Sequence, residues 1–143
     1  MEYHYVTPVD EEQVRRLRIG DTIYISGTIF SSRDAGHKRV LEYINEGRPL
    51  PVDFSNMVLY HVGPIVKKDG DKWLILSAGP TTSARLEMYE ARFIEETGVR
   101  IIIGKGGMGE KTAEACRKFG AVYTIFTGGA GALAAKYIKE VER

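Results

Sequence analysis

The chain has 143 residues, a length that fits one compact domain over residues 1–143. Its 20 Lys and Arg nearly cancel its 19 Asp and Glu, and the net charge of +1 disfavours nucleic-acid binding through a broad basic face. Hydrophobic residues make up 43% of the chain, and no apolar run approaches the roughly 18 residues that would indicate a membrane span.

The first part of the chain is predicted to contain short helices and a strand. Asp10 begins a short helix that ends near Leu17, because its side chain can cap the free N–H groups of the first turn. Apolar and polar residues alternate over Thr22–Phe30, which predicts a strand with one buried face. A helix that ends near Asn45 follows. Its predicted buried stripe consists of His37, Val40, Leu41 and Ile44.

A hairpin is predicted after a further short strand at Met57–Val62. The segments Ile65–Lys67 and Trp73–Leu76 flank the sequence Lys68-Asp69-Gly70-Asp71, which is typical of a tight turn. We therefore expect an antiparallel or separate β portion beside the rest of the fold.

The second half of the chain contains three successive strand–loop–helix units. The strands are predicted at Trp73–Ser77, Val99–Ile103 and Ala121–Phe126, and a loop rich in glycine or hydroxyl residues follows each of them. A closing helix is expected to end near Val141. This succession predicts an α/β fold with a mixed, partly parallel sheet.

The loops of these units collect groups that suit an anion. Arg33, Arg85 and Lys105 lie in or just after three strand-to-helix loops, where free backbone N–H groups and the helix dipole favour negative charge. The hydroxyl residues of these loops are Thr81, Thr82, Ser83 and Thr127. Each residue taken alone also fits a helix cap or a solvated helix end. Their recurrence after several parallel strands indicates one site for a small dicarboxylate or phosphate.

One glycine loop matches a nucleotide-binding pattern only in part. Gly104-x-Gly106-x-x-Gly109 has the spacing of the dinucleotide fingerprint, but the acidic residue expected about twenty positions later is missing. Lys105 is followed by glycine, so the loop does not fit a Walker A motif either. A phosphate- or nucleotide-binding module without catalytic activity stays open as an alternative.

The histidines differ in their surroundings along the sequence. His37 follows Arg33 by one helical turn and lies near Asp34, so it is a candidate general acid or base, and a buried structural histidine is the equally open alternative. His4 and His61 have no comparable neighbours and are interpreted as structural.

Cys116 is the single cysteine, and its position on a predicted helix face indicates a small core residue. One cysteine forms no internal disulfide and holds no iron–sulfur cluster by itself. With no recognisable secretory leader at the N-terminus, this cysteine usage predicts a reducing, cytoplasmic location.

Four ordered motifs resemble a known family, the β subunit or C-terminal domain of class I fumarate hydratases and the related L(+)-tartrate dehydratases. The resemblance extends from about Thr7 to Ala135. The motifs are Arg33-Asp34-Ala35-Gly36-His37-Lys38-Arg39, Gly63-Pro64, Gly79-Pro80-Thr81-Thr82-Ser83-Ala84-Arg85 and Ile103-Gly104-Lys105-Gly106-Gly107-Met108-Gly109.

The resemblance implies a swivelling β/β/α domain that closes over an active site shared with an α subunit or N-terminal domain. That partner is expected to carry a 4Fe–4S cluster with three cysteine ligands, so the present chain itself needs no cofactor. The implied reaction is the reversible hydration of fumarate to (S)-malate, with L(+)-tartrate dehydration as the alternative. The complex is expected to be a heterodimer or heterotetramer that binds a small dicarboxylate, with neither nucleic acid nor membrane as a partner.

The resemblance also implies roles for individual residues. Arg33 and Arg85 would hold the substrate carboxylates, Lys105 would be the third cation, and Thr82 and Gly106 would complete the substrate-binding set. Asp34 would support these groups from behind. His37 and Thr81 match the residues implied in proton transfer, and the sequence does not separate their roles. Physical chemistry alone favours histidine, because a threonine hydroxyl is a poor base unless its surroundings activate it.

Overall fold

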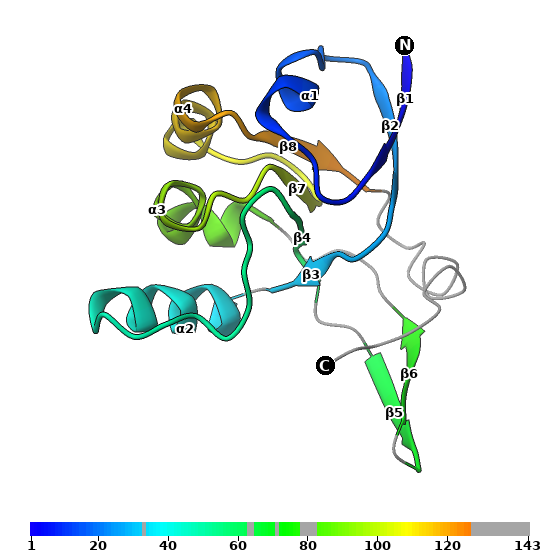
Figure 1. Ribbon diagram of the computed structural model, residues 1–143, viewed down its shortest axis with the longest axis vertical. Coiled ribbons are helices and arrows are strands. Elements are labelled where there is room, and N and C mark those ends of the chain that lie inside the picture. The colour runs from blue at the N-terminus through cyan, green and yellow to red at the C-terminus, as the bar shows by residue number, and fades with distance from the viewer. Residues whose placement is uncertain (33, 63–64, 71, 78–82, 127–143) are drawn as a thin grey trace.

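The computed structural model describes residues 1–32, 34–62, 65–70, 72–77 and 83–126, and its centre is a four-stranded parallel sheet (Figure 1). The strand order is β3-β4-β7-β8. The strands are β3 (Phe30–Ser31), β4 (Val58–Tyr60), β7 (Ile101–Gly104) and β8 (Val122–Ile125). Because all four run in the same direction, their carboxyl ends lie along one edge of the sheet.

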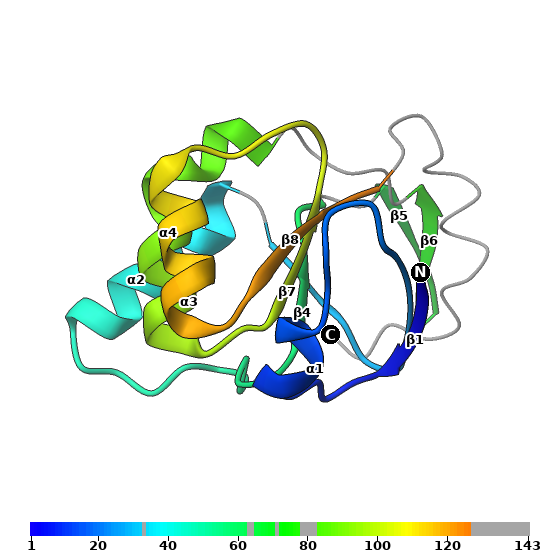
Figure 2. The same ribbon diagram turned by 90° about the horizontal axis from the view of Figure 1, so that it is seen from above.

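Three helices cover one face of this sheet (Figures 1 and 2). They are α2 (Asp34–Asn45), α3 (Glu87–Thr97) and α4 (Glu110–Phe119), with α3 packed between the other two. The core beneath them is built around Leu59 and Ile102, which are paired across β4 and β7, and around Phe93 of α3.

A second β layer covers the opposite face. The strands β1 (Glu2–Val6) and β2 (Thr22–Ser26) pair in parallel, and the short helix α1 (Glu11–Arg15) lies between them in the sequence. Tyr5 and Val9 pack here against Val58 and Ile101, the sheet residues next to Leu59 and Ile102. Successive strand residues thus face opposite cores, so both sides of the parallel sheet are buried. The layers follow the order β/β/α, and the predicted α/β class is confirmed.

The antiparallel hairpin is also confirmed. It consists of β5 (Ile65–Asp69) and β6 (Lys72–Ser77), and it extends away from the layered body (Figure 1). Trp73–Ser77, the strand of the first predicted strand–loop–helix unit, was expected in the parallel sheet but instead forms one arm of this hairpin. A short 3-10 turn, η1 (Ser83–Leu86), leads into α3.

Local capping signals also appear in the structure. The Asp10 carboxylate accepts the backbone N–H of Gln13, and the Gln13 side chain accepts the N–H of Asp10, a reciprocal capping box. The strand predicted over Thr22–Phe30 instead ends at Ser26. Gly27 has a φ of 102°, and a Cβ there would lie 2.4 Å from the Thr7 hydroxyl oxygen, so the chain turns at this close approach.

The predicted helix that ends near Val141 lies outside the described residues, as does Thr127. Within the described ranges, the helices are all too short or too polar to cross a bilayer.

Candidate active site

The candidate site lies where the parallel strands end and the covering helices begin. Ser32 follows β3 and donates its backbone N–H to the Tyr60 carbonyl at 3.0 Å. His61 follows β4 and donates its backbone N–H to the Ile103 carbonyl at 2.8 Å. The strand ends are therefore in register, and the segments leaving β3, β4 and β7 share one edge of the sheet.

An ion pair joins two of these segments. Asp34, the first residue of α2, accepts a hydrogen bond from the Arg85 guanidinium of η1 at 2.8 Å. The side chains keep 49% and 56% of their surface exposed, so solvent screens the pair and its contribution to stability is about 0.2–1 kcal/mol. Asp34 and Arg85, both among the predicted site residues, are thus in direct contact.

The Lys105 loop is held against η1 by its backbone. The Lys105 N–H donates to Ser83 Oγ, and the Ser83 N–H donates to the Lys105 carbonyl, both at 3.0 Å. Lys105 and Gly106 are exposed. The structure therefore brings the loop after β7 next to the turn that carries Arg85. Arg33, Thr81 and Thr82 lie outside the described residues.

Gly104 makes this contact possible. A Cβ at Gly104 would lie 1.9 Å from Ser83 Oγ and 2.8 Å from the Tyr123 hydroxyl oxygen. Tyr123 in turn donates its hydroxyl to the Gly106 carbonyl at 2.6 Å. The first glycine of the fingerprint-like loop thus serves the close packing of Ser83 and Tyr123.

A buried polar cluster lies below the loops. It consists of His37 from α2, His61 after β4 and Glu90 from α3, and the side chains of all three are fully buried. Glu90 Oε2 lies 2.8 Å from His37 Nε2 and 2.7 Å from His61 Nε2. The prediction that His61 lacks neighbours comparable to those of His37 is wrong, because its partners Ser83 and Glu90 are distant in sequence and meet it only in the fold.

A serine hydroxyl contacts the other nitrogen of each ring. Ser32 Oγ lies 2.9 Å from His37 Nδ1, and Ser83 Oγ lies 2.8 Å from His61 Nδ1. A carboxylate only accepts hydrogen bonds, so both Nε2 atoms carry a hydrogen when Glu90 is ionised. Each Nδ1 of a neutral ring then accepts from its serine.

The charge of Glu90 is stabilised by these two rings. Burial by itself raises the pKa of Glu90, but hydrogen bonds and charge interactions with His37 and His61 outweigh burial and leave that pKa below its ordinary value. Among the described residues, Oε1 of Glu90 has no hydrogen-bond partner. The cluster therefore contains an incompletely paired buried carboxylate, which is costly to bury.

A possible metal-binding group among the described residues consists of the same three side chains, His37, His61 and Glu90. Their possible ligand atoms lie within 4.8 Å of one another. Their separations of 2.7 and 2.8 Å are those of hydrogen bonds. Ligand atoms around a tetrahedral zinc ion lie about 3.3 Å apart. We therefore describe the set as a hydrogen-bonded cluster.

Cys116 on α4 is half-buried and packs against the core beneath the helices, as predicted for a small core residue. Burial, together with the nearby carboxylates of Glu90 and Glu87, raises the pKa of its thiol to about 11. A thiol in this environment is a poor thiolate ligand.

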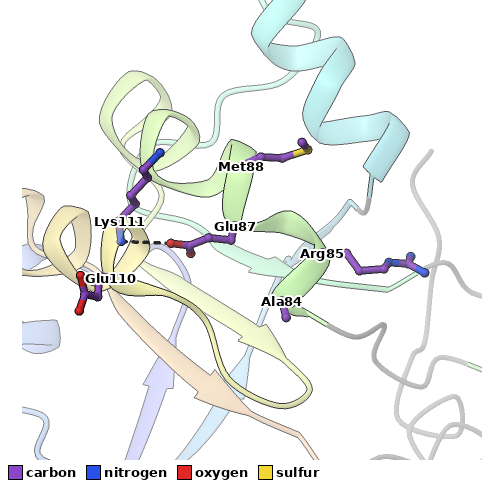
Figure 3. A pocket seen from close by; sticks show the side chains of 6 residues that line it. All are labelled: Ala84, Arg85, Glu87, Met88, Glu110 and Lys111. Carbon is purple, nitrogen blue, oxygen red and sulfur yellow. Dashed lines mark hydrogen bonds between the residues drawn. The ribbon is translucent and has the colours of Figure 1, made fainter.

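A pocket of about 590 Å³ lies beside η1 (Figure 3). Its lining residues are Ala84, Arg85, Glu87, Met88, Glu110 and Lys111. Glu87 and Arg85 point to opposite sides of the η1–α3 segment. The Glu87 carboxylate accepts the backbone N–H of Gly109 at 2.9 Å and of Lys111 at 3.1 Å. A carboxylate of the chain itself therefore occupies the N-terminus of α4.

The protein family described as the fumarase C-terminus matches residues 4–143. The L(+)-tartrate dehydratase subunit beta of Escherichia coli K12 is 47% identical over 136 residues, which cover 95% of this chain and 66% of that protein. The chain thus spans slightly less than two thirds of the length of this curated relative.

Two further relatives come from other organisms. A putative L(+)-tartrate dehydratase subunit beta of Methanocaldococcus jannaschii is 38% identical over 142 residues, with 99% of this chain and 72% of that protein covered. A putative fumarate hydratase class I of Geobacillus stearothermophilus is 41% identical over 136 residues, with 94% of this chain and 26% of that protein covered.

Substitution of Gly104 tests the contact between Ser83 and the Lys105 loop. We expect Gly104→Ala to lower the free energy of unfolding by about 1–3 kcal/mol, because the new Cβ overlaps Ser83 Oγ. Gly107→Ala is the matched control, since a Cβ there meets nothing within 4 Å, and its effect is expected to stay within about 0.5 kcal/mol. Urea unfolding measures both; equal effects would contradict the close packing at Gly104.

Alkylation tests the environment of Cys116. Because its raised pKa leaves little thiolate, iodoacetamide is expected to modify the native chain at pH 8 about a hundredfold more slowly than free cysteine. Between pH 8 and 10 the native rate should keep rising about tenfold per pH unit, whereas the rate of free cysteine levels off. Urea-unfolded chain is the control, and native labelling at the unfolded rate would show a reactive thiol instead.

Proposed function

Because the chain belongs to the fumarase C-terminus family, we propose that it is the β subunit of an iron–sulfur-dependent hydro-lyase that adds water to, or removes it from, a four-carbon dicarboxylate. Its role is to supply carboxylate-binding groups to a site completed by a cluster-bearing α subunit. The names of the tartrate dehydratase relatives support L(+)-tartrate as the substrate. Hydration of fumarate to (S)-malate is the second candidate, supported by the fumarate hydratase relative.

The reciprocal hydrogen bonds between Ser83 and Lys105 are the observation that carries this proposal. They hold the Lys105 loop beside the turn that carries Arg85, and both side chains are exposed. Arg85 and Lys105 thus lie on two separate segments that are next to each other. Their two positive charges match the two negative charges of a dicarboxylate. In the proposed site Arg33, Thr82 and Gly106 complete the substrate contacts.

Arg85 is suited to exchange its partner Asp34 for a substrate carboxylate. Its ion pair with Asp34 uses Nη2, and a guanidinium carries further N–H donors that bind a carboxylate in the bidentate mode. Because the pair is about half exposed, a substrate carboxylate competes for Arg85 at little cost. Asp34 thus orients Arg85 before the substrate arrives.

His37 and Thr81 are the two candidates for proton transfer. His37 is fully buried, and contacts with Ser32 and Glu90 engage both of its ring nitrogens. This burial favours Thr81 as the group that touches the substrate, although histidine is the better base in water. In our proposal a neighbouring group activates the Thr81 hydroxyl in the assembled complex.

The iron–sulfur cluster does not fit this chain. A cluster with three thiolate ligands needs three cysteines, and the chain has only Cys116, whose thiol pKa is raised. We therefore assign the cluster to the proposed α subunit.

The structure argues against the phosphate- or nucleotide-binding alternative. In a dinucleotide site the glycine loop presents the N-terminus of the next helix to a pyrophosphate. Here the Glu87 carboxylate accepts the N–H groups of Gly109 and Lys111 at that position. A phosphate would have to displace a negative group from its hydrogen bonds, which favours carboxylate binding at Arg85 and Lys105 over phosphate binding at α4.

Activity of the assembled complex tests the proposal. Co-expression with a cluster-bearing α subunit should give a complex that converts L(+)-tartrate or fumarate. Arg85→Ala is expected to lower kcat/KM by about 30- to 900-fold, on the order of 2–4 kcal/mol, because a substrate carboxylate loses its charged partner. Arg92→Ala, which removes an exposed arginine of α3, is the matched control and should leave kcat/KM unchanged.

Two outcomes would contradict the proposal. One is a complex that turns over neither acid, and the other is an Arg85→Ala complex as active as the Arg92→Ala complex. Tight binding of a nucleotide by the chain, measured by calorimetry, would favour the phosphate-binding alternative.

A further inference from the structure

The buried cluster connects the two loop segments that carry the exposed cations. Starting at α2, Ser32 contacts His37, and His37 donates to Glu90. His61 donates to the same oxygen of Glu90 from the other side. Ser83 contacts His61 and accepts the Lys105 N–H, which completes the connection. One continuous series of hydrogen bonds thus leads from the start of α2 to the Lys105 loop.

The two ends of this series lie close to the groups assigned to substrate binding. Ser32 lies two residues before Asp34, which pairs with Arg85. Ser83 lies two residues before Arg85 and contacts the backbone of Lys105 in both directions. A change in the cluster would therefore alter the spacing between the α2 N-terminus, η1 and the Lys105 loop.

Stability alone does not explain the cluster. It places a carboxylate among fully buried side chains, and Glu90 Oε1 has no hydrogen-bond partner among the described residues. Replacing buried charged groups by well-packed apolar side chains of similar volume is often neutral or stabilising. A hydrogen-bonded network instead fixes the relative positions of the helices and loops that it joins.

The cluster is also closed to a substrate. His37, His61 and Glu90 have no exposed surface, and their contacts engage both nitrogens of each ring. These residues therefore act on the site through the loops rather than by contact with the reacting atoms.

We propose that Glu90, with His37 and His61, is a positioning residue: it holds the α2 N-terminus and the Ser83–Lys105 contact at a fixed spacing, so that Arg85 and Lys105 are presented together to a dicarboxylate. This inference rests on the proposed function for the identity of the ligand. The mechanical coupling between the cluster and the loops stands independently of it.

The first experiment measures the coupling without activity. In the full chain, Glu90→Gln keeps the shape of the side chain but removes its charge, so both ring N–H groups face a neutral amide oxygen and their charge-assisted hydrogen bonds weaken. We expect backbone N–H exchange at Lys105, followed by NMR, to become about tenfold faster, although Glu90 and Lys105 share no hydrogen bond. Thr97→Val is the matched control, because it removes a buried hydroxyl at the opposite end of α3.

The second variant covers the case in which Glu90→Gln does not fold. Ser83→Ala removes only the hydroxyl that links His61 to Lys105. It should change the ring ¹⁵N shifts of His61 and accelerate exchange of the Ser32 N–H at the other end of the series, because the cluster joins Ser32 to Ser83. Unchanged exchange at Lys105 in folded Glu90→Gln, or at Ser32 in folded Ser83→Ala, would overturn the coupling. A stoichiometric metal in the purified wild-type chain would also overturn it, because the cluster would then be a metal site.

The third experiment uses the complex with the α subunit. Ser83→Ala and Glu90→Gln are expected to lower kcat/KM by about tenfold to a hundredfold, mainly through KM, because displaced cations bind the dicarboxylate less well. His37→Gln should behave in the same way and keep the shape of the wild-type pH profile. Loss of one limb of that profile would make His37 a catalytic residue and overturn its positioning role.

The two proposals fail in different ways. A wild-type complex without activity on either acid overturns the proposed function, while the exchange results at Lys105 and Ser32 still decide the coupling. An active complex in which both cluster variants match Thr97→Val in KM and kcat overturns the positioning role and leaves the proposed function intact.

Discussion

The arrangement of the candidate site depends on the hydrogen bonds that the buried Glu90 carboxylate accepts. Glu90 is located on α3, in the middle of the helical layer, and accepts hydrogen bonds from rings on α2 and after β4. A buried negative charge is tolerated only when such donors are in place. The position of each histidine is therefore coupled to the packing of α3 on the sheet, and the serines beyond the rings extend that coupling to the loops.

The parallel sheet makes this coupling possible. Leu59 pairs with Ile102, and the residues on either side of them face the opposite core, so both faces of β4 and β7 are fixed by apolar packing. A shift of one residue would exchange the two faces, and burial on both sides opposes such a shift. The strand ends, and with them His61 and Gly104, are held in register, which explains how residues distant in sequence form close hydrogen bonds.

Much of the fold was predictable from local sequence signals, and the polar cluster was not. The capping box at Asp10, the apolar stripe of α2 and the hairpin turn at Gly70 each depend on residues close in sequence. Strand β1 was missed although Tyr3 and Tyr5 alternate with polar residues, because a short terminal segment gives little signal. The neighbours of His61 were missed because its partner Glu90 is 29 residues away and on another element. The sequence pattern of α3 gives no signal that marks Glu90, and only tertiary packing buries it.

The glycine loop shows how the same local pattern can serve different chemistry. A fingerprint-like spacing predicts an anion at the following helix, and an anion is indeed present there, but it is the Glu87 carboxylate of the chain. This internal cap satisfies the N-terminus of α4 and fixes the end of the loop that carries Lys105. The first glycine meanwhile admits Ser83 and Tyr123 at close range. Glu87 thus caps α4 at one end of the loop, and Ser83 binds the backbone at the other end. In the proposed site the charge offered to a ligand is therefore on the side chains of Arg85 and Lys105, and the spacing of two cations on fixed loops would select a dicarboxylate by the spacing of its charges.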